Sequence, residues 1–302
     1  EKILSLDARI REAERAELHR LYSLVEANEA AILNWADHLG HLDCFQALSE
    51  VSDLHGWSTP QTLSSSDPRR LSILEGVHPL STASFVPLNI ELSADTTQVM
   101  LLTGPNMSGK STVLRLSAMI ALLHQIGSDV PAKNARLSLF DRIVCRMGAQ
   151  DDLTTGQSTF YVEMREVASM LHGATDRSLL VFDEIGRGTS TFDGMSLAWA
   201  ITEEVHQMKA LCFMATHYLE LSELQKSLER LRSFHLGVQE VDGRLVFTRK
   251  LAEGPASRSY GIQVAKLAEI SPNILKRADE KLLEFERKRS KSFPLFEMMN
   301  SE

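Results

Sequence analysis

The sequence predicts an α/β fold built around a mainly parallel sheet, and three observations support this prediction. The run GPNMSGKST at residues 104–112 lies between an apolar, strand-like segment and a segment with helical spacing. The apolar run 179–182 ends in the two carboxylates of Asp183 and Glu184. A further apolar run covers residues 211–215. Short strands that are apolar throughout are typical of parallel sheets, which are buried on both faces.

The first 56 residues are expected to be helical. Apolar residues recur three or four positions apart, with charged residues between them, in three segments that begin near residues 3, 30 and 42. Two interpretations are open here. One is a helical hairpin packed on its neighbours, which the residues alone favour, and the other is the end of a long lever arm that carries another domain. Residues 56–67 are rich in Ser, Thr and Pro and are expected to connect this part to the next.

Strands are predicted after this connector. Residues 71–74 are apolar, and apolar residues alternate over 86–92, as in a half-exposed strand. A turn is expected between them at 76–80. Phe85 comes just before the second strand. The usual place of a Phe is the core, and a role against a flat ligand needs further support.

The run after the expected strand 99–102 matches G-x-x-x-x-G-K-[ST], the pattern of a phosphate-binding loop. Gly104 and Gly109 allow the backbone to curl so that its N–H groups point at phosphate oxygens. Lys110 has the reach to bind the β- and γ-phosphates, the Ser111 hydroxyl is suited to ligate Mg²⁺, and the start of the following helix adds partial positive charge. The expected nucleotide-binding residues of this loop are Gly104, Pro105, Asn106, Met107, Ser108, Gly109, Lys110, Ser111 and Thr112.

A strand and a helix are expected next, with a polar segment between them. Residues 128–140 are predicted to be irregular and then extended, and residues 142–147 to form a strand. The polar segment covers 148–157. Ser158 or Thr159 is the expected N-cap of a helix that ends near residue 173, and capping alone is enough to explain either residue.

Residues 178–184, SLLVFDE, predict a buried strand that ends in two carboxylates. Charges at the end of such a strand are costly unless they bind something. With a phosphate-binding loop upstream, we expect Asp183 to bind Mg²⁺ through its water shell and Glu184 to polarise the attacking water. A structural salt bridge is the alternative.

Three glycines and small polar residues make residues 186–194 an expected loop that another backbone can approach closely, and a helix is predicted from Met195. The strand predicted at 211–215 ends at Thr216 and His217. A lone His at a strand end is more often structural than catalytic. Its place after the metal-binding strand nevertheless favours His217 as a sensor of the γ-phosphate.

Two strands, 234–238 and 244–248, are predicted to form a hairpin that turns at 242–243. A loop and a helix follow, and Ser271-Pro272 is expected to start the last helix, with Pro at its first position. The expected domains are a helical segment over 1–56, a phosphate-loop nucleotide hydrolase domain over 57–268, and a C-terminal helical element with a tail over 269–302.

Composition sets wider limits. The 302 residues are enough for a sizeable core, and no run of 18 apolar residues predicts a membrane span. The net charge of −8 argues against strong general nucleic-acid binding by this segment alone. The three scattered cysteines favour reduced thiols in the cytosol. Because the chain begins Glu-Lys-Ile without Met or a signal peptide, we expect a fragment or a processed chain.

Five motifs in this order resemble the MutS family of DNA mismatch-repair ATPases, within the wider ABC-type ATPase class. They lie at residues 103–112, 158–164, 183–194, 215–218 and 257–261. Residues 1–56 resemble the helical segment that leads from the family's DNA-clamp arm into its core. The resemblance implies an ABC-type phosphate-loop fold, with ATP as substrate and Mg²⁺ as cofactor, so residues 57–268 are expected to be an ATPase domain. It also implies that the helices over 269–302 belong to the family's dimerisation element.

The resemblance also implies roles for single residues. Asn106 is similar to a residue that binds phosphate, and Phe85 to the family aromatic that stacks on adenine. Ser158 and Thr159 resemble the segment that completes the partner subunit's site, and His217 resembles a switch residue. The implied partners are a second subunit, here expected as a homodimer, mismatched double-stranded DNA bound through regions outside this chain, and a MutL-type repair protein. The implied location is the cytoplasm, or the nucleus in a eukaryote.

Three positions depart from the family pattern. Ser108 stands where Gly or Ala is common, Arg249 where some relatives offer a His to the adenine, and Tyr161 where Met is common. The predicted function is Mg²⁺-dependent ATP hydrolysis that switches a DNA clamp between states. The alternatives are an ATP-gated dimerisation module with little turnover and another ABC-type DNA-repair or chromosome ATPase.

Overall fold

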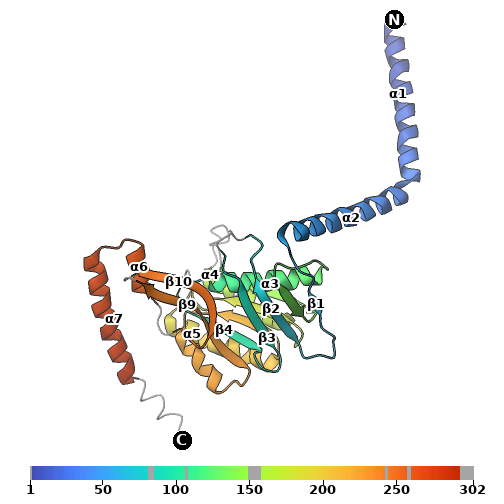
Figure 1. Ribbon diagram of the computed structural model, residues 1–302. Coiled ribbons are helices and arrows are strands. Elements are labelled where there is room, and N and C mark those ends of the chain that lie inside the picture. Colours follow the sequence, from blue (N-terminus) through green and yellow to red (C-terminus); the bar gives the residue numbers. More distant parts are fainter. Residues whose placement is uncertain are drawn as a thin grey trace. The chain divides into compact units, whose positions relative to one another are not determined.

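The computed structural model describes residues 2–80, 85–105, 108–148, 158–241, 244–256 and 260–292. The chain divides into two compact units, Glu1–Gly56 and Trp57–Glu302 (Figure 1). In the described part of the chain, no helix is long and apolar enough to cross a membrane.

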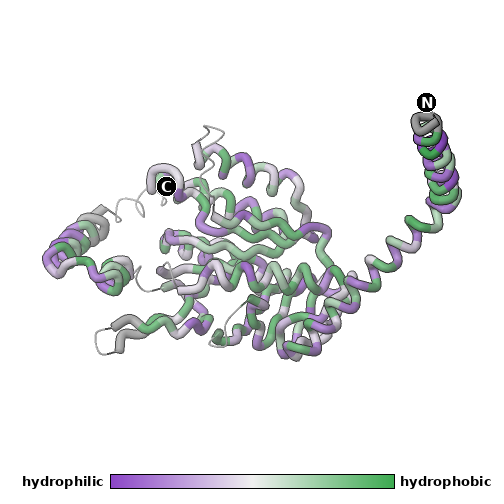
Figure 2. The backbone as a smooth tube through the Cα atoms, turned by 90° about the horizontal axis from the view of Figure 1, so that it is seen from above, coloured by the Kyte–Doolittle hydropathy of each residue, from purple (hydrophilic) through white to green (hydrophobic). Residues whose placement is uncertain are grey.

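The first unit consists of two helices, where the sequence predicted three segments. They are α1 (Lys2–Ala27) and α2 (Glu29–His55), and Gly40 lies inside α2 with open space around it. Gly56 ends α2 in the left-handed conformation, and its N–H bonds the carbonyl of Ser52. Hydrophobic and hydrophilic residues are interspersed along both helices (Figure 2). The large apolar side chains of both helices are exposed: Leu6, Ile10, Leu18, Leu21, Leu24, Ile32, Leu33, Leu39, Leu42 and Phe45.

The main sheet of the second unit has six strands in the order β10-β9-β4-β8-β7-β6. All neighbouring pairs from β9 to β6 are parallel, and β10 is antiparallel to β9. This confirms the predicted α/β fold with a mostly parallel sheet. The strands are β4 (Val99–Thr103), β6 (Ile143–Arg146), β7 (Leu179–Asp183), β8 (Leu211–Ala215), β9 (Leu231–Val241) and β10 (Arg244–Glu253).

Helices cover both faces of this sheet (Figure 1). On one face, α3 (Lys110–Gln125) packs on Met100 and Leu102 of β4. On the other face, α4 (Thr159–Gly173) and α5 (Thr191–Met208) join Val99 and Leu101 in a second core. Successive β4 side chains therefore enter opposite cores, which explains why the strand is apolar at every position.

A second, smaller sheet has the strand order β1-β5-β2-β3. Its strands are β1 (Gln61–Thr62), β2 (Arg70–Gly76), β3 (Leu88–Ser93) and β5 (Asn134–Leu137). The predicted alternation is confirmed from Leu88 to Leu92, where Asn89 and Glu91 are exposed between buried apolar residues. The strand starts two residues later than predicted, after Pro87, which has no N–H to donate to a ladder.

One helix boundary differs from the prediction. Helix α5 begins at Thr191, four residues before the predicted Met195, so the preceding loop is shorter than expected. The reason is local, because the Ser190 hydroxyl caps the helix by accepting from the Asp193 N–H at 3.3 Å. Ser158 occupies the N-cap of α4 as predicted, but its side chain makes no capping hydrogen bond among the described residues.

The remaining elements lie toward the C-terminus. The 3₁₀-helix η1 (Leu219–Lys226) follows β8. Strands β9 and β10 pair as the predicted hairpin, whose expected turn at 242–243 is outside the described residues. Helix α6 (Gly261–Leu267) precedes α7 (Pro272–Ser292), and Pro272 is the first helical residue, as predicted.

Candidate functional site

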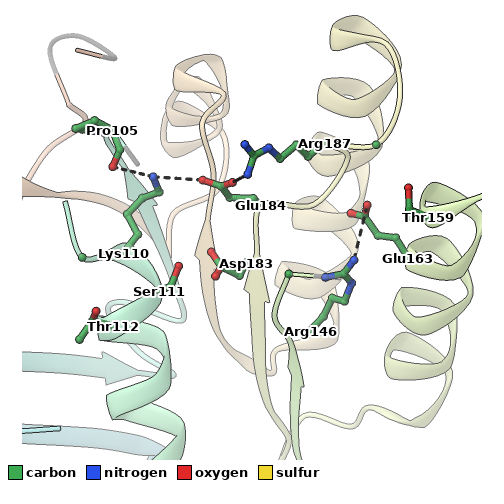
Figure 3. Close-up of a pocket in the computed structure, with 13 residues that line it drawn as sticks. Pro105, Lys110, Ser111, Thr112, Arg146, Thr159, Glu163, Asp183, Glu184 and Arg187 are labelled. Carbon is green, nitrogen blue, oxygen red and sulfur yellow. Dashed lines mark hydrogen bonds and ion pairs between the residues drawn. The ribbon is translucent and has the colours of Figure 1, made fainter. Parts of the chain in front are cut away.

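A cavity of about 540 Å³ lies where the C-terminal ends of β6 and β7 meet the start of α3 (Figure 3). In α/β proteins with parallel strands, ligands bind at this edge of the sheet. Its lining residues come from four segments: Pro105, Gly109, Lys110, Ser111 and Thr112; Arg146 and Gly148; Thr159 and Glu163; and Asp183, Glu184, Arg187 and Gly188.

Lys110 is the first residue of α3, and its side chain is only 4% exposed. Gly109 just before it has a φ of 108°, a conformation that side chains other than glycine rarely adopt. The Lys110 Nζ donates to the carbonyls of Gly104 at 2.6 Å and Pro105 at 3.2 Å. Burial lowers the pKa of Lys110, and the negative charge of Glu184 opposes this shift. The ammonium group is thus held at the mouth of the loop by acceptors that a phosphate could replace.

Asp183 ends strand β7 on the side of the cavity where Ser111 lies in the first turn of α3 (Figure 3). The Asp183 Oδ1 is buried and has no hydrogen-bond partner among the described residues, and the same holds for the Ser108 Oγ. A buried carboxylate oxygen without a partner is costly unless a cation occupies the site. No cluster of three potential metal-binding side chains exists among the described residues. A carboxylate with a hydroxyl fits Mg²⁺, which takes few protein ligands and keeps water or phosphate oxygens.

Glu184 has a φ of 55°, which is unusual for a residue other than glycine. Its N–H donates to the carbonyl of Ala215, at the end of β8, at 2.9 Å. This hydrogen bond fixes the turn that directs the carboxylate into the cavity, where Glu184 Oε1 lies 3.5 Å from Lys110 Nζ. Its Oε2 accepts from Arg187 Nη1 at 2.9 Å (Figure 3). Such a strained backbone costs about 1–3 kcal/mol and is typical of functional sites.

His217 follows β8, and its ring centroid lies 3.9 Å from that of Tyr218. The protein atoms around it lower its pKa by desolvation, and the charge of Glu184 opposes the shift. At neutral pH the imidazole is therefore mostly neutral and carries one N–H donor. His217 does not line the cavity in this single chain.

The structure brings together eight of the predicted site residues around the cavity: Pro105, Gly109, Lys110, Ser111, Thr112, Thr159, Asp183 and Glu184. Gly104, Ser108 and Ser158 lie beside this set without lining the cavity, and Asn106 and Met107 are outside the described residues. Phe85 is partly buried, packs against the core cluster that includes α3 residues, and does not line the cavity.

Sequence reasoning missed five lining residues: Arg146, Gly148, Glu163, Arg187 and Gly188. Two of them could have been predicted from the sequence. Arg146 is a charged residue at the end of an apolar strand, and the same pattern led to the prediction of Asp183. Glu163 shares a helical face with the buried Val167 and Met170, so its carboxylate occupies a position where an apolar residue is expected.

The fold and the site define an α/β protein with a candidate site at the C-terminal edge of a parallel sheet. Comparison with known proteins goes further, because residues 100–286 match the family model described as MutS domain V. The chain belongs to the MutS family.

Three bacterial relatives, each named DNA mismatch repair protein MutS, illustrate the similarity. The chain is 46% identical over 293 residues to the protein of Roseiflexus sp. (strain RS-1), covering 95% of the chain and 27% of the relative. It is 43% identical over 295 residues to that of Salinibacter ruber, covering 95% and 32%. It is 43% identical over 291 residues to that of Symbiobacterium thermophilum, covering 95% and 33%. The chain therefore spans between a quarter and a third of the length of these relatives.

Proposed function

We propose that this chain is the ATP-hydrolysing switch domain of a DNA mismatch-repair protein. The observation that carries the proposal is the cavity in which Lys110, Ser111, Asp183 and Glu184 meet. The ammonium group and the hydroxyl lie at the start of helix α3, and the two carboxylates lie at the end of strand β7. Nucleotide hydrolysis needs these groups to bind phosphate and Mg²⁺ and to activate water.

In this proposal the residues 104–112 form a phosphate-binding loop. The positive end of the α3 dipole and the Lys110 ammonium attract the phosphates of ATP. Lys110 exchanges its bonds to the Gly104 and Pro105 carbonyls for charge-assisted bonds to phosphate oxygens. Ser111 and Asp183 hold Mg²⁺, which when bound neutralises charge on the phosphates.

Glu184 acts as the general base that accepts a proton from the attacking water. Its side chain is only 14% exposed, and its contact with Lys110 places it beside the expected phosphate position. His217 acts as a switch that donates its single N–H toward the γ-phosphate. Phe85 stacks on the adenine. These two roles rest on the family resemblance.

The complete site belongs to a dimer. Ser158 and Thr159 are exposed at the start of α4, which leaves their hydroxyls and the helix-start N–H groups available to a second copy. Ile274, Leu282 and Phe285 on α7 are exposed apolar residues, which supports a dimerisation role for the C-terminal element. Mismatched DNA is bound by regions outside this chain, a MutL-type protein receives the ATP-dependent signal, and the protein works in the cytoplasm.

A second candidate function is an ATP-gated dimerisation module that turns over little. The contacts of Glu184 with Lys110 and Arg187 favour it, because both carboxylate oxygens already face a cation and not an attacking water. The test is ATP turnover with Mg²⁺ and again with a chelator. Turnover that requires Mg²⁺ supports the hydrolase. Tight ATP binding without turnover would instead support the module, and failure to bind ATP at all would overturn both.

A further inference from the structure

The peptide groups of Gly186, two residues after Glu184, are held from both sides by buried side chains. The Gly186 N–H donates to Glu163 Oε1 at 2.8 Å, and its carbonyl accepts from the Tyr218 hydroxyl at 3.0 Å. Glu163 and Tyr218 are both buried, with 5% and 4% of their surface exposed, respectively. Neither residue has a part in the hydrolysis described above.

The backbone around this point has no spare room. Gly186 has a φ of 85°, and a Cβ there would lie 2.5 Å from the Gly194 carbonyl oxygen, in helix α5. A Cβ on Gly194 would in turn collide with the Gly186 carbonyl and lie 2.5 Å from the Tyr218 hydroxyl. Because neither residue has a Cβ, the backbones of Gly186 and Gly194 pack in direct contact. This contact restricts the position of Gly186.

Glu163 connects Gly186 to helix α4. Its second oxygen, Oε2, lies 3.9 Å from Arg146 Nη2, so the carboxylate faces a buried cation as well as the Gly186 N–H. One residue beyond Arg187, Gly188 packs on Phe160, where an added Cβ would lie 3.1 Å from the Phe160 Cβ. The loop after Glu184 thus rests on the first turns of the helix that begins with Thr159.

Tyr218 connects Gly186 to the end of β8. It directly follows His217, and the two rings are in contact. The Tyr218 N–H donates to the Thr216 Oγ1 at 3.0 Å, which fixes the turn after the strand. One glycine peptide therefore joins three segments: the one that carries Glu184, the one that carries His217, and the helix that begins with Thr159.

We propose that Glu163 and Tyr218 are positioning residues that lock the Gly186 peptide and thereby keep Glu184, His217 and the start of α4 in one fixed arrangement. This inference rests on the proposed ATP hydrolysis. The physical reason is the strained φ of Glu184, which persists only while the surrounding structure enforces it. Without the two hydrogen bonds, the segment relaxes to a common backbone conformation and the carboxylate leaves its place in the cavity.

Tyr218→Phe removes one hydroxyl and leaves the ring in place. We expect kcat for ATP to fall about three- to tenfold, the change that corresponds to one hydrogen bond of ordinary strength. KM is expected to stay within about twofold, because the phosphate-binding loop is untouched. The matched control is Thr202→Val, which also removes a buried hydroxyl, one that donates to Ala198 O at 2.6 Å in α5.

Glu163 is tested with a conservative and a disruptive change. Glu163→Gln retains an acceptor for the Gly186 N–H and is expected to keep most of kcat, whereas Glu163→Leu lacks it and is expected to lower kcat more than Tyr218→Phe does. The control is Glu166→Leu, because the Glu166 Oε2 lies 3.0 Å from Arg146 Nε but the residue makes no bond to Gly186. Since both residues act on one peptide, Tyr218→Phe with Glu163→Leu should lose less than the product of the single effects.

The outcomes are distinguishable. A wild-type chain without ATP turnover overturns the proposed function and this inference with it. An active wild type with unchanged kcat in Tyr218→Phe overturns the inference alone, as does a fall that Thr202→Val reproduces or one that appears only in KM. If Glu163→Leu does not fold, Tyr218→Phe alone tests the inference. A fall in the kcat of Tyr218→Phe at constant KM then supports it.

Discussion

Lys110 and Glu184 form an ion pair across the candidate site, with Nζ and Oε1 3.5 Å apart. Lys110 comes from the start of α3 and Glu184 from the end of β7, two elements far apart in the sequence. Without a nucleotide, each charge offsets part of the burial cost of the other. In the proposed mechanism, a phosphate that draws Lys110 away also releases Glu184, so this contact would link phosphate binding to the activation of the proposed base.

Lys110→Ala is expected to weaken ATP binding by about 100-fold, which corresponds to the loss of hydrogen bonds to a charged group worth about 3 kcal/mol. The measurement is titration with a fluorescent ATP analogue. Lys133→Ala is the matched control, because Lys133 is exposed and pairs with Glu75 away from the cavity. Normal affinity in the Lys110 variant would contradict the phosphate-loop assignment.

Glu184→Gln is expected to lower single-turnover hydrolysis by about 10²–10⁴-fold, the usual contribution of a positioned general base. ATP affinity should be retained or should increase, because the neutral amide no longer competes for Lys110. Glu223→Gln, on the exposed 3₁₀-helix, controls for the loss of a charge. If hydrolysis continued at the wild-type rate, the assignment of Glu184 as the base would be wrong and another group would have to activate the water.

Gly194→Ala is expected to lower the free energy of unfolding by about 1–3 kcal/mol, because the new methyl group overpacks the contact with Gly186. Equilibrium unfolding by urea measures this change. Gly261→Ala is the control, since a Cβ at the start of α6 meets nothing within 4 Å and the change should stay within about 0.5 kcal/mol. Equal losses in both variants would show that the close contact of the two glycines does not matter for stability.

Much of this architecture could be predicted because it is local. A parallel strand buried on both faces is apolar at each position, so β4, β7 and β8 were readable, and so was the carboxylate at the end of β7. The start of α5 was also readable in principle from Ser190 and Asp193, which form a capping pattern. It was not predicted, because the glycines and small polar residues of 186–194 indicated a loop over the whole segment.

The supporting contacts could not be predicted in the same way. The hydrogen bond from Gly186 to Glu163 joins a loop to a helix that precedes it in the chain. No local sequence pattern predicts a contact between residues so far apart in the sequence. The exposed apolar residues of α1 and α2 pose a related problem. Their spacing predicted helices correctly, but spacing alone says nothing about what covers the apolar side chains.

Stability is expected to fall on acidification because of a buried histidine. His124 is buried in α3, with its Nε2 2.8 Å from the Thr62 Oγ1, and burial lowers its pKa below the ordinary value of 6.5. When the pH falls below about 6.5, the unfolded chain therefore binds a proton on this histidine more readily than the folded chain does. The free energy of unfolding rises with pH and decreases as the pH falls through this range. Thermal unfolding at several pH values measures the slope. The slope should be smaller in His124→Gln and unchanged in His172→Gln, which alters an exposed histidine of α4; equal slopes would contradict the assignment.

Turnover per subunit is expected to rise with protein concentration and then level, because the proposed site is complete only when a second copy contributes the start of its α4. The experiment follows ATP hydrolysis with Mg²⁺ and without DNA over a wide concentration range. Ser158→Ala should lower the plateau rate, while Ser169→Ala, an exposed change on the same helix, should not. A flat rate with a monomeric species in sizing experiments would mean that one chain suffices, and the role of Ser158 across a dimer would then be wrong. A flat rate with a dimeric species would instead mean that the dimer is already formed at the lowest concentration, and the plateau rate of Ser158→Ala would then decide.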